Sequence, residues 1–344
     1  MIVYALTDYK NHFGSKWKSN PYRSGYDKNI MKELFNKEGY EIKFISFHDI
    51  NFTDSWKDRV VIYTSSEEYC LHYKSFIEDI ILTLERLGAI ILPKYDYLRA
   101  NNNKVYMEIL KQLKLNRVSK DSSSRYYGTL DELSIDLNCD KIKFPCVIKS
   151  ASGAMSRGVH LAKNKKELVK YAKVLSSSSN YKINIKEQVR KLKYKGYLRE
   201  SAYQNKFIIQ KFIPNLKNDW KILIYYDHYY ILNRGIKKND FRASGSHFNY
   251  KAGSKSEFPL RLFEEVKKIY ETLDIPNLSL DLAYNQEDWY IIEFQCLNFG
   301  TSTIEFSKDY YDSSNKKWLV KSGDNLQEYE YTYSIINYIK KKLL

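Results

Sequence analysis

Two carboxylates and an amide near the C-terminus could together bind a metal ion. Asp281 lies in the apolar run Leu278–Tyr284, and Glu293 and Gln295 lie in the next apolar run. The polar break Asn285–Asp288 between the runs is typical of a turn that joins two strands. Glu293 and Gln295 are two residues apart and therefore point to one face, and strand pairing can place Asp281 beside them. Such oxygens suit Mg²⁺ that carries substrate phosphates, although on its own the hairpin could equally carry ordinary solvated acids.

A glycine-containing loop follows the apolar strand that ends near Lys149. The loop, Ser150–Gly158, has small residues and two glycines, Gly153 and Gly158, so its backbone amides could close over phosphates. The Lys149 ammonium could neutralise phosphate oxygens. The glycine spacing is that of a Walker A motif, but Val159–His160 stand where Lys-Ser/Thr is required, which excludes a P-loop. A β-hairpin with a surface lysine is the alternative interpretation.

A further apolar strand, Phe207–Ile213, is followed by a hairpin that carries basic residues. The free backbone groups at the end of the strand could bind the edge of an adenine ring, but a plain buried strand explains the pattern equally well. Lys221, Arg234 and Arg242 could converge on a polyanion, since arginine suits bidentate contacts with phosphate or carboxylate. The chain has 56 lysines and arginines, so the order and spacing of the motifs must carry the argument.

Composition limits the class of protein. A chain of 344 residues can bury a sizeable core in two or three lobes, and 43% hydrophobic residues is typical of a globular protein. No apolar run approaches the ~20 residues of a membrane span, the N-terminus lacks a secretory signal pattern, and four cysteines lack ligand spacing. These features predict a cytoplasmic protein with reduced thiols. A net charge of +15 favours anionic partners such as nucleotides, nucleic acid, acidic sugars or an anionic membrane face.

The beginning of the chain alternates apolar strands with amphipathic helices, which predicts a small parallel α/β layer. The polar loop 8–26 lies beyond the carboxyl end of the first strand, where ligands gather in open α/β sheets. The predicted strands of this layer are 2–6, 41–46, 59–64 and 89–92, and its predicted helices are 27–37 and 69–87.

The motifs, taken in order, resemble the ATP-grasp superfamily, the fold of D-alanine–D-alanine ligase, glutathione synthetase and the ribosomal-protein glutamate ligases. The resemblance covers about residues 90–310 and rests on the order of the motifs, from Asn-x-Lys at Lys104 to Glu-x-Gln at Glu293. It implies an α/β ATP-grasp fold with a pre-ATP-grasp domain. The implied domains are a pre-ATP-grasp α/β domain at 1–97, a linker and lid-bearing lobe at 98–205, and a lobe with the metal site at 206–344.

The resemblance also implies a role for each matched residue. Lys104 and Lys149 would bind the phosphates of ATP, under a lid that includes Ser152, Gly153 and Gly158. Arg234, Arg242 and Lys221 would be the catalytic cations that hold the transferring phosphate or the substrate carboxylate. The adenine hinge would be Gln210, Lys211, Phe212 and Ile213, and the magnesium ligands would be Asp281, Glu293 and Gln295.

This sequence departs from the family pattern at several of these positions. Lys211 stands where the hinge usually has an acid, and Lys221 stands where related ligases often have arginine. Gln295 replaces the usual asparagine, which keeps the amide oxygen on a longer arm, and Arg242-Ala-Ser replaces an Arg-x-Asn pattern. The stretch Asp-Phe-Arg-Ala-Ser-Gly-Ser and the stretch Glu-Phe-Gln followed by Phe-Gly-Thr resemble a distinct branch, with a loose likeness to polysaccharide-linked ATP-grasp proteins.

The activity implied by the resemblance is an ATP- and Mg²⁺-dependent carboxylate–amine ligase that acts through an acyl phosphate. Positioning and charge neutralisation carry such phosphoryl transfers. The basic stretch Lys237–Arg242 and the many tyrosines favour a sugar acid or similar anionic metabolite as the carboxylate, with a small amine as its partner. Peptide or amino-acid carboxylates stay open. Asn298–Thr303 and the loop 8–26 are candidates for the acceptor pocket by position.

Two alternative functions remain from the sequence. A kinase of the same superfamily would phosphorylate a hydroxyl and form ADP without an amine. A nucleic-acid-binding module is favoured by the charge and by 32 tyrosines that could stack on bases, but it leaves the ordered motifs unexplained. The sequence does not indicate an oligomeric state.

Overall fold

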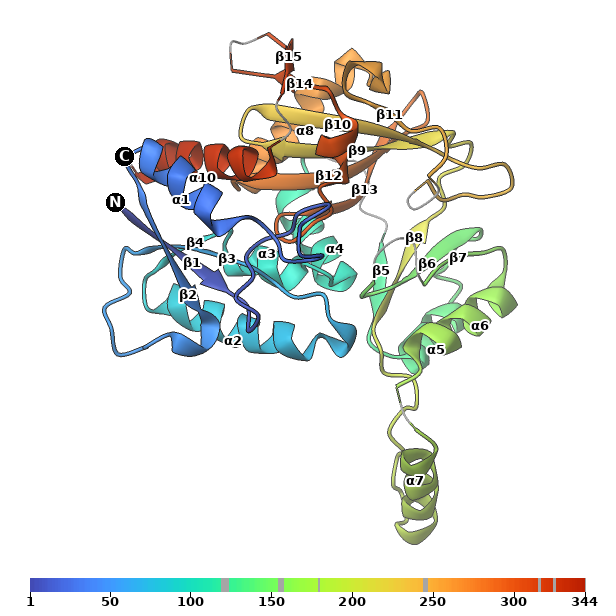
Figure 1. The fold of residues 1–344 in the computed structure, drawn as a ribbon. Helices are drawn as coiled ribbons and strands as arrows, with labels where there is room; N and C mark the ends of the chain where they lie inside the picture. Colours follow the sequence, from blue (N-terminus) through green and yellow to red (C-terminus); the bar gives the residue numbers. More distant parts are fainter. Residues whose placement is uncertain are drawn as a thin grey trace. The chain divides into compact units, whose positions relative to one another are not determined.

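The computed structural model describes residues 1–118, 124–153, 158–178, 180–243, 247–314, 317–323 and 326–343 (Figure 1). The chain forms two compact units, each considered by itself below. Unit 1 comprises Met1–Asn101, Leu113–Lys120 and Leu216–Leu344, and unit 2 comprises Asn102–Gln112 and Asp121–Asn215. The division into three domains stays a prediction.

Unit 1 begins with a four-stranded parallel sheet in the order β2-β1-β3-β4. The helices α1 and α2 follow β1 and β3, as expected for parallel strands joined by crossover connections. The parallel α/β layer predicted from the alternation is therefore confirmed. The elements are β1 (Ile2–Thr7), α1 (Lys28–Lys37), β2 (Glu41–Ser46), β3 (Val60–Tyr63), α2 (His72–Arg86), β4 (Ile90–Leu92) and α3 (Tyr95–Ala100).

Unit 1 also contains an antiparallel sheet in the order β13-β12-β9-β10-β14-β15, and the short β11 pairs with β10. Its strands are β9 (Asn218–Tyr225), β10 (His228–Gly235), β11 (Lys251–Ala252), β12 (Asn277–Tyr284), β13 (Trp289–Gln295), β14 (Asp309–Asp312) and β15 (Leu319–Ser322). The helices of this part are α8 (Leu260–Leu273), α9 (Ser302–Phe306) and α10 (Gln327–Leu343).

The helix α10 closes the core of the parallel sheet, although it comes last among the elements. Ile335, Ile336 and Ile339 are fully or almost fully buried in one cluster with Val3 and Met31. In Figure 1, α10 lies beside α1. Burial of these aliphatic side chains, at about 25 cal/mol per Å² of apolar surface, fixes the helix on the sheet.

Unit 2 is built on an antiparallel sheet in the order β5-β8-β6-β7. The helices α5 and α6 pack their apolar side chains, including Leu133 and Leu168, against Ile148 and Phe207 of the sheet. The elements are α4 (Lys104–Leu115, of which unit 2 includes the residues up to Gln112), β5 (Arg125–Tyr127), α5 (Leu130–Asn138), β6 (Cys146–Ser150), β7 (Val159–Ala162), α6 (Lys165–Ser176), α7 (Tyr181–Lys193) and β8 (Phe207–Lys211).

Among the described residues, no helix is both long and apolar enough to cross a membrane.

Candidate functional site

The register of the antiparallel sheet brings the three predicted magnesium ligands together. Asp281 on β12 pairs directly with Glu293 on β13, and Ser279 pairs with Gln295. Residues directly opposite each other on paired strands share a face of the sheet. A register shift after Asp281 gives β13 an extra residue, a bulge that lies next to the two carboxylates. The two carboxylates and the amide therefore share one face, as the alternation predicts.

Two of the predicted cations reach this face from the neighbouring strands. Lys221 on β9 pairs with Asp281 in the register, and its Nζ lies 3.7 Å from Asp281 Oδ1. The same ammonium donates a hydrogen bond of 2.8 Å to the Ser279 hydroxyl. On β10, Arg234 places Nη2 2.9 Å from Asp281 Oδ2. Asp281 therefore lies between a lysine and an arginine.

Asp219 completes a carboxylate–arginine cluster, by which we mean Asp219, Lys221, Arg234 and Asp281. Arg234 Nε and Nη2 donate to the two oxygens of Asp219 at 2.6 and 2.9 Å, a bidentate contact. Both side chains are buried. The sequence analysis gave Asp219 no role. Its spacing of two from Lys221, which puts both residues on one strand face, is the signal that could have found it.

Burial sets the acidity of this cluster. It raises the pKa of Asp219 to about 6 and, together with the nearby Asp281, outweighs the opposing effect of Arg234. Burial alone would lower the pKa of Arg234, but Asp281 and Asp219 hold it above its ordinary value. Arg234 is therefore a permanent cation held in a fixed orientation between two carboxyl groups.

Arg242 lies apart from this cluster in the loop that follows β10. Its Nε and Nη2 donate to the Asp240 carboxylate at 3.0 and 3.1 Å, and its side chain is 40% exposed. The hydrogen bonds that Arg242 donates to the Asp240 carboxylate raise the pKa of Arg242. The structure therefore places Arg242 in a separate surface ion pair, and residues 244–246 just beyond it lie outside the described residues.

The donor set on the sheet face fits a magnesium ion by its chemistry. Asp281, Glu293 and Gln295 supply two carboxylates and one amide, which are the hard oxygen ligands that Mg²⁺ prefers. Over the described ranges, no group of three or more His, Cys, Asp or Glu residues is arranged to hold a metal. The predicted set has two residues of those types, Asp281 and Glu293, and its third ligand is the amide of Gln295.

In unit 2, the structure brings Lys104 to the start of the glycine loop. Lys104 Nζ donates to the Gly153 carbonyl at 2.8 Å, and the Lys104 backbone N–H donates to the Ala151 carbonyl at 2.7 Å. The Gly153 N–H donates to Asn102 Oδ1 at 2.7 Å. Exposed Ser152 lies within this stretch. The start of the loop is therefore fixed on the N-terminus of α4.

The other end of the loop depends on a glycine. Gly158 has φ +69°, and a Cβ there would lie 3.1 Å from the Ser150 Cβ and 3.2 Å from Leu175. Its carbonyl accepts a hydrogen bond of 2.9 Å from the Ser150 N–H. Lys149 is buried on β6 and pairs with Val159 and Ile208 on the two neighbouring strands. The centre of the predicted lid, 154–157, lies outside the described residues.

The predicted adenine hinge begins where β8 leaves the sheet. The register of β8 with β6 ends at exposed Lys211, and Phe212 and Ile213 follow it half-buried. The side chain of Gln210 donates to Glu108 Oε1 at 2.7 Å. The hinge strand is therefore hydrogen-bonded to α4.

Sequence reasoning missed the acid that Gln210 contacts. Glu108 Oε2 lies 2.8 Å from Lys111 Nζ, and both residues are buried. A Glu-x-x-Lys pair places both residues on one face of a helix. The signal was available in the sequence, because this pair falls among the apolar positions of α4.

The two candidate stretches for the acceptor pocket are neighbours in unit 1. The Trp17 N–H in the loop 8–26 donates to Thr301 Oγ1 at 2.8 Å, and Thr301 donates to Gln327 Oε1 at 2.6 Å. A small cavity between the stretches is lined by residues of both and by buried neighbours; these are Gly14, Ser15, Tyr26, Tyr63, Pro93, Asn277, Cys296, Leu297, Asn298, Phe299 and Tyr331.

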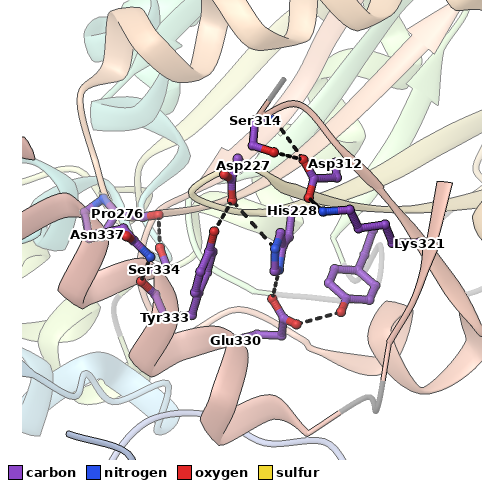
Figure 2. Close-up of polar contacts among 11 residues, drawn as sticks. Asp227, His228, Pro276, Asp312, Ser314, Lys321, Glu330, Tyr333, Ser334 and Asn337 are labelled. Carbon is purple, nitrogen blue, oxygen red and sulfur yellow. Dashed lines mark hydrogen bonds and ion pairs between the residues drawn. The ribbon is translucent and has the colours of Figure 1, made fainter. Parts of the chain in front are cut away.

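A second polar group, the histidine cluster, comprises buried His228, Tyr230 and Glu330 together with half-buried Asp227 and Tyr333 (Figure 2). His228 Nδ1 lies 2.8 Å from Glu330 Oε2, and Nε2 lies 3.7 Å from Asp227. Tyr230 donates to Glu330 at 2.9 Å and Tyr333 donates to Asp227 at 2.7 Å. The cluster ties α10 to the β9–β10 hairpin, and sequence reasoning did not find it.

The fold was compared with known proteins. No family model matches the sequence, and no curated protein is similar to it. D-cycloserine synthetase DcsG superposes with a TM-score of 0.56 at 12% identity over 98% of this chain and 99% of that one. A RimK domain protein ATP-grasp from Sphaerobacter thermophilus DSM 20745 gives 0.52 at 11% identity, again over 98% and 99% of the two chains.

A third similar structure is the macrocyclase MdnC of Microcystis aeruginosa MRC, bound with precursor peptide MdnA. It gives a TM-score of 0.51 at 10% identity over 98% of this chain and 99% of that one. Together with the sheets described above, these likenesses show that the chain has the ATP-grasp fold.

Proposed function

We propose that the chain is an ATP- and Mg²⁺-dependent ligase that joins a carboxylate to an amine through an acyl phosphate. The observation that carries this proposal is the face of the antiparallel sheet in unit 1. There, Asp281, paired with Glu293, lies beside the two cations Lys221 and Arg234. A donor set for a metal next to fixed cations is what phosphoryl transfer requires, because positioning and charge neutralisation carry that chemistry.

Each group on this face has a distinct task under this proposal. Asp281, Glu293 and Gln295 would hold the magnesium ion, which when bound neutralises charge on phosphate oxygens. Arg234 presents a cation whose orientation is set by its two hydrogen bonds to Asp219, so it need not reorganise as charge develops. Asp219 is thus a positioning residue for Arg234.

Unit 2 supplies the groups proposed to hold the nucleotide. Lys104, Lys149 and the loop that begins at Ser150 would bind the phosphates, and the stretch Gln210–Ile213 would bind the adenine. The contacts from Lys104 and Asn102 to Gly153 support a loop that is held at its start. Backbone amides beside a held ammonium form a concave anion site.

The carboxylate substrate is proposed to be a sugar acid or a similar anionic metabolite, and the amine a small one. The basic stretch Lys237–Arg242 supports an anionic substrate. A peptide carboxylate is the second candidate, since the similar macrocyclase MdnC was solved with its precursor peptide. We propose a cytoplasmic location, where ATP is available.

Two experiments test the proposal. Calorimetry with Mg·ATP should show binding that Lys149→Ala weakens and that Lys163→Ala, an exposed lysine beyond β7, leaves intact. Absence of binding by the unaltered chain would reject the ATP-dependent reading. A screen of ADP release with carboxylates crossed against amines, with product mass as the readout, should then find a condensation product. ADP formed with a phosphorylated hydroxyl and no amine would replace the ligase with a kinase.

A further inference from the structure

The helix α7 of unit 2 carries an apolar stripe on its outside. Tyr181, Ile185, Val189 and Leu192 recur at spacings of four, four and three, and at about 100° per residue they fall within about 80° of the helix circumference. Their exposed fractions are 69%, 60%, 56% and 88%. Exposure of single apolar residues is ordinary, but four in one continuous stripe indicate a binding surface.

The opposite side of α7 is the side that is held. Glu187 is buried and accepts hydrogen bonds of 2.7 Å from the Tyr197 hydroxyl and 3.1 Å from the Glu200 N–H. Arg190 lies 2.5 Å from the same carboxylate. The segment that returns from α7 to β8 is therefore held on the Glu187 side of the helix, while the four residues of the stripe stay exposed.

Basic residues border the stripe. The segment 180–200 has seven lysines and arginines against two glutamates, a net charge of +5. On the helical wheel, Lys182, Lys186 and Lys193 follow one edge of the stripe and Lys191 lies beyond the other edge. Lysines of this kind can keep their charge in water while their stems extend along an apolar surface.

We propose that α7 binds the surface of a lipid membrane that contains anionic headgroups. A basic amphipathic helix of this kind lies in the membrane interface, with its apolar face among the acyl chains and its lysines at the anionic headgroups. Tyr181 at one end and exposed Tyr194 just beyond the other suit the headgroup level. The chain would then bind the membrane from one side through unit 2, in keeping with its lack of a spanning helix in the described residues.

Charge and shape favour lipid over the other occupants of such a surface. A second copy of the chain would bring an identical segment of charge +5 against this one, which repulsion opposes. Nucleic acid would gain from the lysines, but three of the four stripe residues are aliphatic and offer no stacking surface for bases. A single helix is convex and has no groove of its own to receive a peptide, whereas a membrane surface accommodates a convex stripe.

The test is flotation of the full chain with vesicles of phosphatidylcholine alone or of phosphatidylcholine with phosphatidylglycerol. We expect binding to the anionic vesicles, at least about tenfold weaker binding to neutral ones, and loss of binding as salt is raised. Ile185→Asp combined with Leu192→Asp should reduce anionic-vesicle binding more than about tenfold, since it places two charges on the apolar face. Lys186→Glu combined with Lys191→Glu should do the same.

Matched controls separate this surface from the total charge and hydrophobicity of the chain. Ile135→Asp changes a residue of α5 that is 63% exposed, and Lys166→Glu changes an exposed lysine of α6; neither should alter binding. Melting temperatures identify any variant that unfolds. If Ile185→Asp combined with Leu192→Asp does so, Leu192→Ser is used in its place. Equal binding to neutral and anionic vesicles, full binding by the α7 variants, or interaction of α7 only with an acidic protein would overturn the proposal.

Discussion

The two buried polar clusters of unit 1 differ in what surrounds them. The carboxylate–arginine cluster lies on a sheet face that continues into Glu293 and Gln295, two further side chains with oxygen ligands. The histidine cluster is packed against aromatic rings. The centroid of the His228 ring lies 4.3 Å from the centroid of the Tyr310 ring and 4.4 Å from that of the Tyr333 ring.

This difference separates a cluster suited to chemistry from one suited to holding elements together. Burying charged groups is costly unless they are paired, so both clusters must satisfy their own members. The first leaves further ligands beside its charges and contains an acid, Asp219, whose pKa burial raises to about 6. Perturbed acids of this kind gather at functional sites. The second ties α10 to the β9–β10 hairpin.

The largest effect is expected when the cation of the first cluster is removed. Arg234→Met would leave Asp219 buried without its bidentate partner and Asp281 with Lys221 alone, at a cost of about 3–5 kcal/mol in the free energy of unfolding. Urea titration measures this loss, and Lys238→Met, on the exposed stretch after β10, serves as the control. A loss under about 1 kcal/mol would mean that water satisfies the two carboxylates and that the cluster in solution is less buried than in the structure.

Glu293→Gln should separate chemistry from stability. It removes one carboxylate of the proposed metal site, so ATP consumption with the true substrates should fall by about a hundredfold or more, while the melting temperature changes little. Asp288→Asn changes an exposed acid in the turn of the same hairpin and should keep full turnover. Near-normal turnover of Glu293→Gln would reduce the hairpin to a structural role.

Glu330→Gln should show the reverse pattern in the histidine cluster. The substitution weakens the contacts with His228 and Tyr230, so the free energy of unfolding should fall by about 2 kcal/mol. Turnover per folded molecule should stay unchanged, because this cluster is proposed only to hold α10 in place. Glu287→Gln, at an exposed turn, controls for the chemical change. A loss of turnover without a loss of stability would assign the histidine cluster a part in catalysis.

The smallest effect concerns pH. Burial raises the pKa of Asp219 from 3.8 to about 6, so the folded chain binds a proton there more tightly than the unfolded chain. The stability from this group is fully present below pH 3.8 and is lost as pH rises through about 6. The difference in unfolding free energy between the unaltered chain and Asp219→Asn should therefore fall as pH rises from 3.8 through about 6. A difference that is flat with pH would show that Asp219 stays ionised beside Arg234.

Local patterns predicted much of the fold. Alternation in Leu278–Tyr284 and in the run that follows gave the hairpin, and the register then placed Asp281 opposite Glu293 as expected. The strand–helix alternation gave the parallel layer in the same way. In each case the signal lies within a few residues, and the burial of one face converts it into structure.

Long-range pairings could not be predicted in this way. His228 and Glu330 are 102 residues apart, and only the position of α10 brings them together. The contact of Arg234 with Asp219 is more local, since the turn at Tyr226–Asp227 sets the register of the β9–β10 hairpin that pairs them. The sequence analysis also assigned no element to α7, because its apolar stripe faces outward and most of its residues are polar.

The packing of α10 has a consequence for the order in which the chain can fold. Ile335, Ile336 and Ile339 complete the same core as Val3 and Met31, yet the ribosome makes them last among the elements described. The strands of the parallel sheet therefore emerge long before the helix that covers one of their faces. Until α10 is released, that apolar face is open to solvent and to other nascent chains, so the parallel sheet should complete its folding only after α10 has left the ribosome.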